Sequence, residues 1–146
     1  MDIATAGRRA AGTRTFLDVL RAWALLPQST PEKDLAALSR GDALIVAARL
    51  HCDDGWHRGS LRIAMTSDTP LSWIERQSSN SVTFGLPVRL RDVRLAFTWE
   101  HRHVGKALQS RVLVFNASGH LWQMAVPTID VPLVREAFRS AGPPGA

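Results

Sequence analysis

The sequence predicts a mainly β fold with a minor helical part. We expect a strongly bent seven-stranded antiparallel sheet or small barrel, closed by a C-terminal helix and preceded by one or two N-terminal helices. Two observations predict this class. Short segments with apolar residues at every second position recur between residues 43 and 126, separated by turns rich in Gly, Asn and Asp. Helical spacing of apolar residues is confined to the two ends of the chain.

Residues 1–42 are expected to form an N-terminal helical arm with a flexible start. Apolar residues at helical spacing predict a helix over about residues 13–26, which packs on the domain, on a partner or on an anionic membrane. A second, short helix is expected to begin near Pro31 and to end at Gly41, because proline suits the first turn of a helix and glycine its end.

Seven strands are expected between these helices. We predict them at residues 43–50, 56–65, 71–76, 82–90, 93–100, 108–115 and 120–126. The fifth is the clearest, since Val93, Leu95, Phe97 and Trp99 fall on one face of a strand, and we expect this face to be buried. Residues 101–106 are expected to form a loop that follows it.

The end of the chain changes period again. Asp130 and Pro132 predict the start of the C-terminal helix, at residues 131–139. We therefore expect residues 43–140 to form one β-roll with its closing helix, and residues 141–146, which contain Gly-Pro-Pro-Gly, to form a disordered tail. A length of 146 residues favours a single domain.

The charge is basic and comes almost entirely from arginine. The formal net charge is +5, with sixteen Arg and two Lys. A GC-rich bacterial genome would explain part of this excess, but Arg is also suited to bidentate contacts with carboxylate or phosphate. The single cysteine, Cys52, cannot form an internal disulfide, and no apolar run is long enough to span a membrane. A cytoplasmic location is expected.

Four stretches suggest a known fold family: Asp54-Gly-Trp-His-Arg-Gly59, Leu71-Ser-Trp73, Gly119-His-Leu-Trp122 and residues 131–139. With the order of the elements, they resemble the pleckstrin-homology-like fold over about residues 43–140, including its GRAM-type bacterial relatives and small actinobacterial domains of unassigned activity. The resemblance implies a non-catalytic interaction module without a cofactor. Such a module would bind a protein partner, a copy of itself or an anionic surface such as a membrane. The first inter-strand loop, residues 52–55, is acidic here, which opposes specific phosphoinositide binding.

Basic residues are the candidates for contact with an anionic surface or an acidic partner. They are Arg58, Arg62, Arg89, Arg91, Arg94, Arg102 and Lys106. If one face of the sheet gathers them, that face attracts anions; the alternative is an ordinary solvated surface. Nucleic acid is disfavoured as a partner, because the tryptophans fall at positions that core burial explains, which leaves few aromatic rings to stack on bases.

Catalysis and metal binding have weaker support. The candidate metal ligands are His51, His57, His101 and His103, which would have to meet across the sheet. The sequence has no nucleophile elbow and no glycine-rich phosphate loop, so we favour a function without catalysis. The alternatives are a ligand-binding or enzymatic domain with a cone-like curved sheet, a small metal-binding domain and a nucleic-acid-binding protein.

Overall fold

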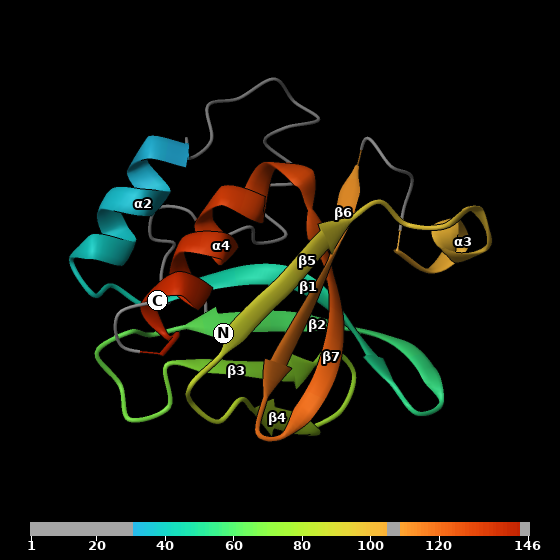
Figure 1. Cartoon of the computed structure of the whole chain (residues 1–146), viewed down its shortest axis with the longest axis horizontal. Helices are drawn as coiled ribbons and strands as arrows, with labels where there is room; N and C mark the ends of the chain where they lie inside the picture. The colour runs from blue at the N-terminus through green and yellow to red at the C-terminus, as the bar shows by residue number, and fades with distance from the viewer. Residues whose placement is uncertain (1–30, 105–108, 144–146) are drawn as a thin grey trace.

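The computed structural model describes residues 31–104 and 109–143. Seven strands form a single antiparallel sheet in the order β4-β3-β2-β1-β7-β6-β5, which is not closed into a barrel (Figure 1). The strands are β1 (Leu44–Cys52), β2 (Gly55–Ile63), β3 (Leu71–Glu75), β4 (Ser81–Thr83), β5 (Arg89–Arg94), β6 (Ser110–Ala117) and β7 (His120–Pro127). The predicted class is confirmed: a mainly β protein with a seven-stranded antiparallel sheet and a C-terminal helix.

Strand β1 joins the two halves of the sheet. Its even-numbered residues from Leu44 to Leu50 are buried, and it pairs with β2 through a turn at Asp53 and Asp54. Gly55 closes this turn at φ +123°, a backbone conformation that favours glycine. On its other side β1 pairs with β7, and in Figure 1 the strands β2 and β3 cross β5, β6 and β7 at a steep angle, so that the sheet bends over.

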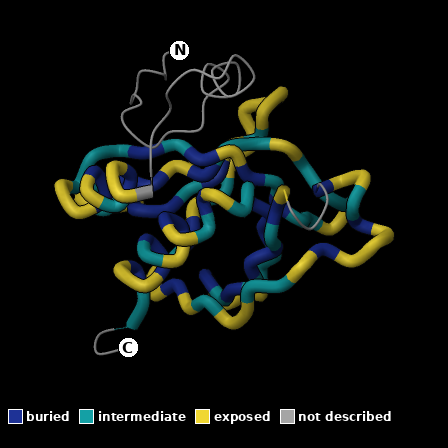
Figure 2. The backbone as a smooth tube through the Cα atoms, turned by 90° about the horizontal axis from the view of Figure 1, so that it is seen from above, coloured by how far each residue is buried: buried dark blue, intermediate teal, exposed yellow. Residues whose placement is uncertain are grey.

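The core lies between the concave face of this sheet and two helices. Helix α4 (Val131–Ser140) covers the open side, and its ring of Phe138 packs on Phe115 of β6 with ring centroids 4.7 Å apart. Helix α2 (Pro31–Ser39) packs against α4 and is followed by Gly41 at φ +82°, as the sequence predicts. In Figure 2 the buried residues lie toward the interior of the molecule and many of the exposed residues lie on the loops at its periphery.

Gly59 of β2 allows a close approach between strands. The indole of Trp73 lies over it and donates a hydrogen bond of 3.1 Å to the carbonyl oxygen of Ala48. A Cβ atom on Gly59 would overlap the carbonyl oxygen of Ile74 and lie 2.5 Å from the indole ring. A side chain at position 59 would therefore have to displace the backbone of Ile74 or the indole of Trp73.

The prediction of a buried strand over residues 93–100 is wrong. Strand β5 ends at Arg94, and the chain continues as a 3-10 turn, η2 (Thr98–Glu100), and a short helix, α3 (His101–Val104), where a loop was expected. Leu95, Phe97 and Trp99 are exposed. The cause is Glu100, which accepts a hydrogen bond of 2.9 Å from the backbone N–H of Phe97 and thereby turns the chain back on itself.

The predicted strand at residues 82–90 is also wrong in its extent. Strand β4 ends at Thr83 and β5 begins at Arg89, with Leu86 and Pro87 between them. Proline has no N–H to donate to a ladder, which fits this break. A 3-10 turn, η3 (Thr128–Asp130), precedes α4. The predicted helix at residues 13–26 lies outside the described residues. Within residues 31–104 and 109–143, no helix is long and apolar enough to cross a membrane.

Candidate functional site

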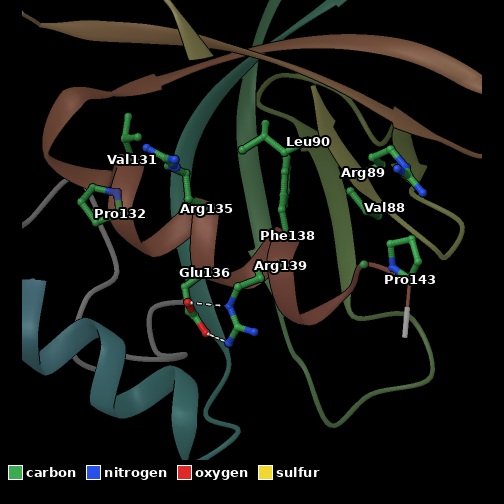
Figure 3. A pocket seen from close by; sticks show the side chains of 11 residues that line it. Val88, Arg89, Leu90, Val131, Pro132, Arg135, Glu136, Phe138, Arg139 and Pro143 are labelled. Carbon is green, nitrogen blue, oxygen red and sulfur yellow. Dashed lines mark hydrogen bonds and ion pairs between the residues drawn. The ribbon is translucent and has the colours of Figure 1, made fainter. Parts of the chain in front are cut away.

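A groove of about 710 Å³ lies between strand β5 and helix α4 (Figure 3). Leu90 and Phe138 form its middle; Val131, Pro132 and Arg135 line one side, and Val88 and Arg89 line the other. A volume of this size is within the range of sites that hold a small ligand or a short peptide. We therefore treat this groove as the candidate functional site.

The two walls of the groove are positioned by the amphipathicity of α4 and by one backbone contact. Leu133, Val134, Ala137 and Phe138 are buried against the sheet, which leaves the polar face of the helix at the groove. The backbone N–H of Val88 donates a hydrogen bond of 2.9 Å to the carbonyl oxygen of Ala141. This bond joins the start of β5 to the end of α4 and fixes the distance between the walls.

Strand β5 is an edge strand of the described sheet. It pairs with β6 on one side, and no described strand pairs with its other side. In an antiparallel ladder alternate residues direct their N–H and C=O groups to opposite sides, so about half of β5 presents backbone groups at the free edge. A register shift between Leu90 and Asp92 marks a bulge at Arg91.

The groove carries a surplus of positive charge. Three guanidinium groups line it, those of Arg89, Arg135 and Arg139, against one carboxylate, that of Glu136. Arg139 donates a hydrogen bond of 3.0 Å to Glu136; this hydrogen bond lowers the pKa of Glu136 and raises that of Arg139. Arg89 and Arg135 form no ion pair with any described residue.

The basic residues predicted from the sequence are not gathered in one place. Arg58 and Arg62 are exposed on the outer face of β2, Arg89 and Arg91 lie on β5, Arg94 ends that strand, and Arg102 lies on α3. Lys106 lies outside the described residues. Of this set, only Arg89 lines the groove.

Sequence reasoning missed the two arginines that α4 contributes to the groove. Arg135 and Arg139 are four residues apart, a spacing that places both side chains on one face of a helix. This spacing indicates a shared basic face of the helix. It does not indicate that this face lies beside the edge of β5, because that depends on how α4 packs on the sheet.

Arg94 has an internal role that the sequence did not indicate. Its guanidinium donates hydrogen bonds to both carboxylate oxygens of Glu100, at 2.8 and 3.1 Å, and to Gln123 at 2.7 Å. It also lies 4.4 Å from the ring centroid of Phe97. Because its donors are used within the chain, Arg94 supports the turn after β5 instead of facing an external anion.

The candidate metal ligands lie on three elements, β1, β2 and α3. His51 packs edge-on against Trp56 at 5.0 Å between ring centroids, and His101 and His103 lie on α3. Across residues 31–104 and 109–143, no group of three or more His, Cys, Asp or Glu side chains could hold a metal ion.

His57 bridges two carboxylates at the end of the β1–β2 hairpin. Its Nε2 lies 2.6 Å from Asp54 and its Nδ1 lies 2.9 Å from Glu75 of β3. The hydrogen bonds to Asp54 and Glu75 raise the pKa of His57. The pKa of Asp54 is lowered by His57, and that of Glu75 by Ser78, His57 and Asn80. This arrangement favours a charged imidazolium that links the turn to β3.

The stability given by His57 is expected to depend on pH. A raised histidine pKa stabilises the fold below the ordinary value of 6.5, and this contribution is lost as the pH rises through the raised pKa. The lowered carboxylate pKa values contribute above the ordinary 3.8 and 4.5 and lose that contribution as the pH falls. We therefore expect the melting temperature of the wild type to exceed that of His57→Gln most between about pH 5 and 6.5.

The control for this measurement is His120→Gln, which removes an exposed ring from the start of β7. A difference between wild type and His57→Gln that stays constant from about pH 5 to pH 9 would contradict the charged bridge.

Comparison with known proteins adds no further assignment to this geometry. No family model, no curated protein and no solved structure matches the chain. The candidate function therefore has to be argued from the groove itself.

Proposed function

We propose that this protein is a non-catalytic interaction module whose groove between β5 and α4 binds an extended, acidic segment of a partner protein. The observation on which this depends is that a positively charged groove runs along a free strand edge. A free edge offers backbone hydrogen bonds to an added strand, and the side-chain groove beside it selects which strand is added.

The dimensions of the groove suit a short extended segment. Strand β5 has six residues and therefore spans about 20 Å at roughly 3.4 Å per residue. A segment of similar length, added along β5, would place alternate side chains over Leu90 and Phe138. Apolar side chains at those positions would be buried, and the backbone would complete the ladder on the free side of β5.

The charge of the groove selects an acidic occupant. Arg89 and Arg135 have no acidic partner among the described residues, so carboxylates of the bound segment would pair with them. A second copy of this chain is a poor occupant, because its own edge carries Arg89 and Arg91 and would be repelled. Residues 1–30 contain four Arg and two Asp and are mismatched for the same reason.

The resemblance noted in the sequence supports the same class of function. The pleckstrin-homology-like resemblance implies binding instead of catalysis, and an antiparallel sheet followed by a C-terminal helix is the architecture it requires. A partner protein in the cytoplasm is part of this proposal, in agreement with the single cysteine, Cys52.

The test uses a fluorescein-labelled peptide of about eight residues in which Glu alternates with Val, titrated with the full chain and followed by fluorescence anisotropy. We expect saturable binding that Arg135→Glu weakens by about tenfold or more, because a charge-assisted contact becomes a repulsion. Arg62→Glu, which reverses an exposed charge on the outer face of β2, is the matched control and should bind like the wild type.

Two comparison peptides make the test decisive. A peptide with Lys in place of Glu is expected to bind more weakly than the acidic one. A peptide with N-methyl groups on alternate amides keeps its charge but cannot complete the hydrogen-bond ladder with β5, so it is also expected to bind more weakly. Equal binding of the Glu and Lys peptides would overturn the acidic preference. Equal binding of the N-methylated and unmodified peptides would overturn strand addition.

A further inference from the structure

Three arginines lie side by side on the outer face of the sheet and are here called the arginine row. Arg49 of β1 is the register partner of Arg58 of β2. Arg76 lies opposite Arg58 in the continuation of the β2–β3 register, and its backbone N–H donates a hydrogen bond of 2.8 Å to the carbonyl oxygen of Arg58. Leu50, next to Arg49, is buried on the inner face, so the row points outward. Opposed residues have Cα atoms about 5 Å apart, which gives a row of about 10 Å across three strands.

The arginine row has no carboxylate beside it to balance its charge. The positions of β1, β2 and β3 that share the outer face contain no Asp or Glu, and Glu75, next to Arg76 in the chain, points to the inner face. Arg58 and Arg76 form no ion pair and no side-chain hydrogen bond with any described residue. Burial, and then the neighbouring charge of Arg58, lower the pKa of Arg49. Like charges directly opposite each other destabilise a sheet, so the row is suited to an anionic ligand that relieves the repulsion.

An exposed tryptophan, Trp99 of the turn η2, is held in a fixed position. It is 69% exposed, and its ring stacks on that of Phe97, with centroids 5.8 Å apart and planes inclined by 20°. The ring of Phe97 is in turn contacted by the guanidinium of Arg94, which lies 4.4 Å from the ring centroid. One face of the indole is thus supported and the other is open to solvent, an arrangement that can stack a nucleic-acid base.

Two contacts place this turn at the β1 end of the arginine row. Arg49 donates a hydrogen bond to the carbonyl oxygen of His103, on the helix α3 that directly follows η2. Trp56, on the outer face of β2, packs against the outer cluster that contains Val104, the last residue of α3. In Figure 1, α3 and the turn between β1 and β2 extend on the same side of the molecule. A ligand chain that crosses the row can therefore reach Trp99.

We propose that the outer face of the sheet binds single-stranded nucleic acid, with phosphates on the arginine row and a base stacked on Trp99. Guanidinium groups bind phosphate oxygens bidentately, and every base has a π-face, so such a site does not depend on base sequence. The reason against nucleic acid, burial of the tryptophans, does not hold for Trp99. This inference does not rest on the proposed function of the groove, whose helix α4 covers the inner face of the sheet.

The combination of charge and ring favours a single strand over other anions. An inorganic polyphosphate or an acidic protein would meet the charges of the row but has no base to stack on the open indole face of Trp99. A duplex keeps its base faces within its own stack and would meet the row alone. Only a single strand presents phosphates and free base faces together.

The test is fluorescence anisotropy of a labelled oligothymidylate of about twelve nucleotides, titrated with the full chain at several salt concentrations. We expect saturable binding in which the logarithm of the affinity falls against the logarithm of the salt concentration with a slope of about −2, as three phosphate contacts on a single strand require. Arg58→Gln should reduce the steepness of this slope by about 0.7 and weaken binding several-fold at low salt. Trp99→Ala should weaken binding by about fivefold or more and leave the slope unchanged, since stacking releases no counterion.

Matched controls lie away from this face. Arg135→Gln removes an exposed charge from α4, and Leu86→Ala removes an exposed apolar side chain from the segment before β5; both should bind like the wild type. Arg58→Gln also relieves the repulsion within the row, so its melting temperature should equal or exceed that of the wild type. This measurement separates lost binding from lost folding.

Four results would overturn the proposal. The first is the absence of saturable binding at low salt. The second is equal binding of oligothymidylate and of inorganic polyphosphate with the same charge, which would indicate a site for phosphate alone. The third is an unchanged affinity in Arg58→Gln or in Trp99→Ala, which would place the oligonucleotide elsewhere. The fourth is its displacement by the alternating Glu and Val peptide, which would place it in the groove.

Discussion

Replacing Phe138 with alanine is expected to lower the free energy of unfolding by about 3–5 kcal/mol. The ring is 1% exposed, packs on Phe115 and forms part of the floor of the groove. Its removal would forfeit the transfer free energy of a buried aromatic ring and leave a cavity between α4 and β6 that the sheet cannot close. Urea or guanidinium unfolding followed by circular dichroism measures this loss.

The informative comparison is Trp99→Ala, measured in the same way. Tryptophan is the larger residue, yet Trp99 is mostly exposed and, among the described residues, its ring stacks on Phe97 alone, so we expect its loss to cost less than about 1 kcal/mol. The period-two pattern of residues 93–100 leads to the opposite expectation. If Trp99→Ala were as destabilising as Phe138→Ala, Trp99 would have to be buried, as in the strand predicted over residues 93–100, and its exposed position would be contradicted.

Glu100→Gln is expected to destabilise the protein by about 2–4 kcal/mol. Burial raises the pKa of Glu100, but hydrogen bonds from Arg94 and from the backbone of Phe97 outweigh it, so its pKa is lowered overall. Glutamine preserves the size of the side chain but removes the charge that compensates Arg94, and an uncompensated, partly buried guanidinium is costly. Chemical unfolding at neutral pH measures the effect.

The pH dependence of this variant provides a second readout. A lowered carboxylate pKa stabilises the fold above the ordinary value of 4.5, and that contribution is lost as the pH falls through the lowered pKa. The difference between wild type and Glu100→Gln should therefore shrink on acidification. Glu136→Gln, which removes an exposed carboxylate paired with Arg139, is the matched control and should cost less than about 1 kcal/mol. Equal losses in the two variants would contradict the buried pair.

The parts of the fold that were predicted correctly are those that local pattern determines. The hairpin of β1 and β2 follows from alternating apolar residues around Asp53, Asp54 and Gly55, and α4 follows from apolar spacing after Pro132. Both are local in sequence, so neighbouring residues define them.

The error over residues 95–100 occurred where side-chain hydrogen bonds, one of them to another strand, override the period-two pattern. Val93, Leu95, Phe97 and Trp99 alternate as a strand would, but Arg94 and Glu100 pair with each other and Arg94 reaches Gln123 on β7. This network ends the strand, and the period-two pattern of apolar residues does not encode it. Period-two alternation beyond the end of a strand therefore reflects an exposed surface here, not a buried face.

The candidate site depends on the same kind of long-range information. Arg89 is recognisable as a basic residue of a strand, and Arg135 as part of the polar face of a helix. Only the packing of α4 beside the free edge of β5 brings them to one groove. That packing depends on the whole sheet. The sequence therefore shows which residues are basic, but it does not predict which of them meet at the groove.

Hydrogen exchange at the amides of β5 tests the central proposal most directly. The measurement compares the free protein with the protein saturated by the alternating Glu and Val peptide. Strand addition predicts slower exchange at alternate amides between Arg89 and Arg94, whose N–H groups are directed to the free edge, while the amides of β4 at the opposite edge remain unchanged. Saturating binding without any added protection in β5 would contradict the account.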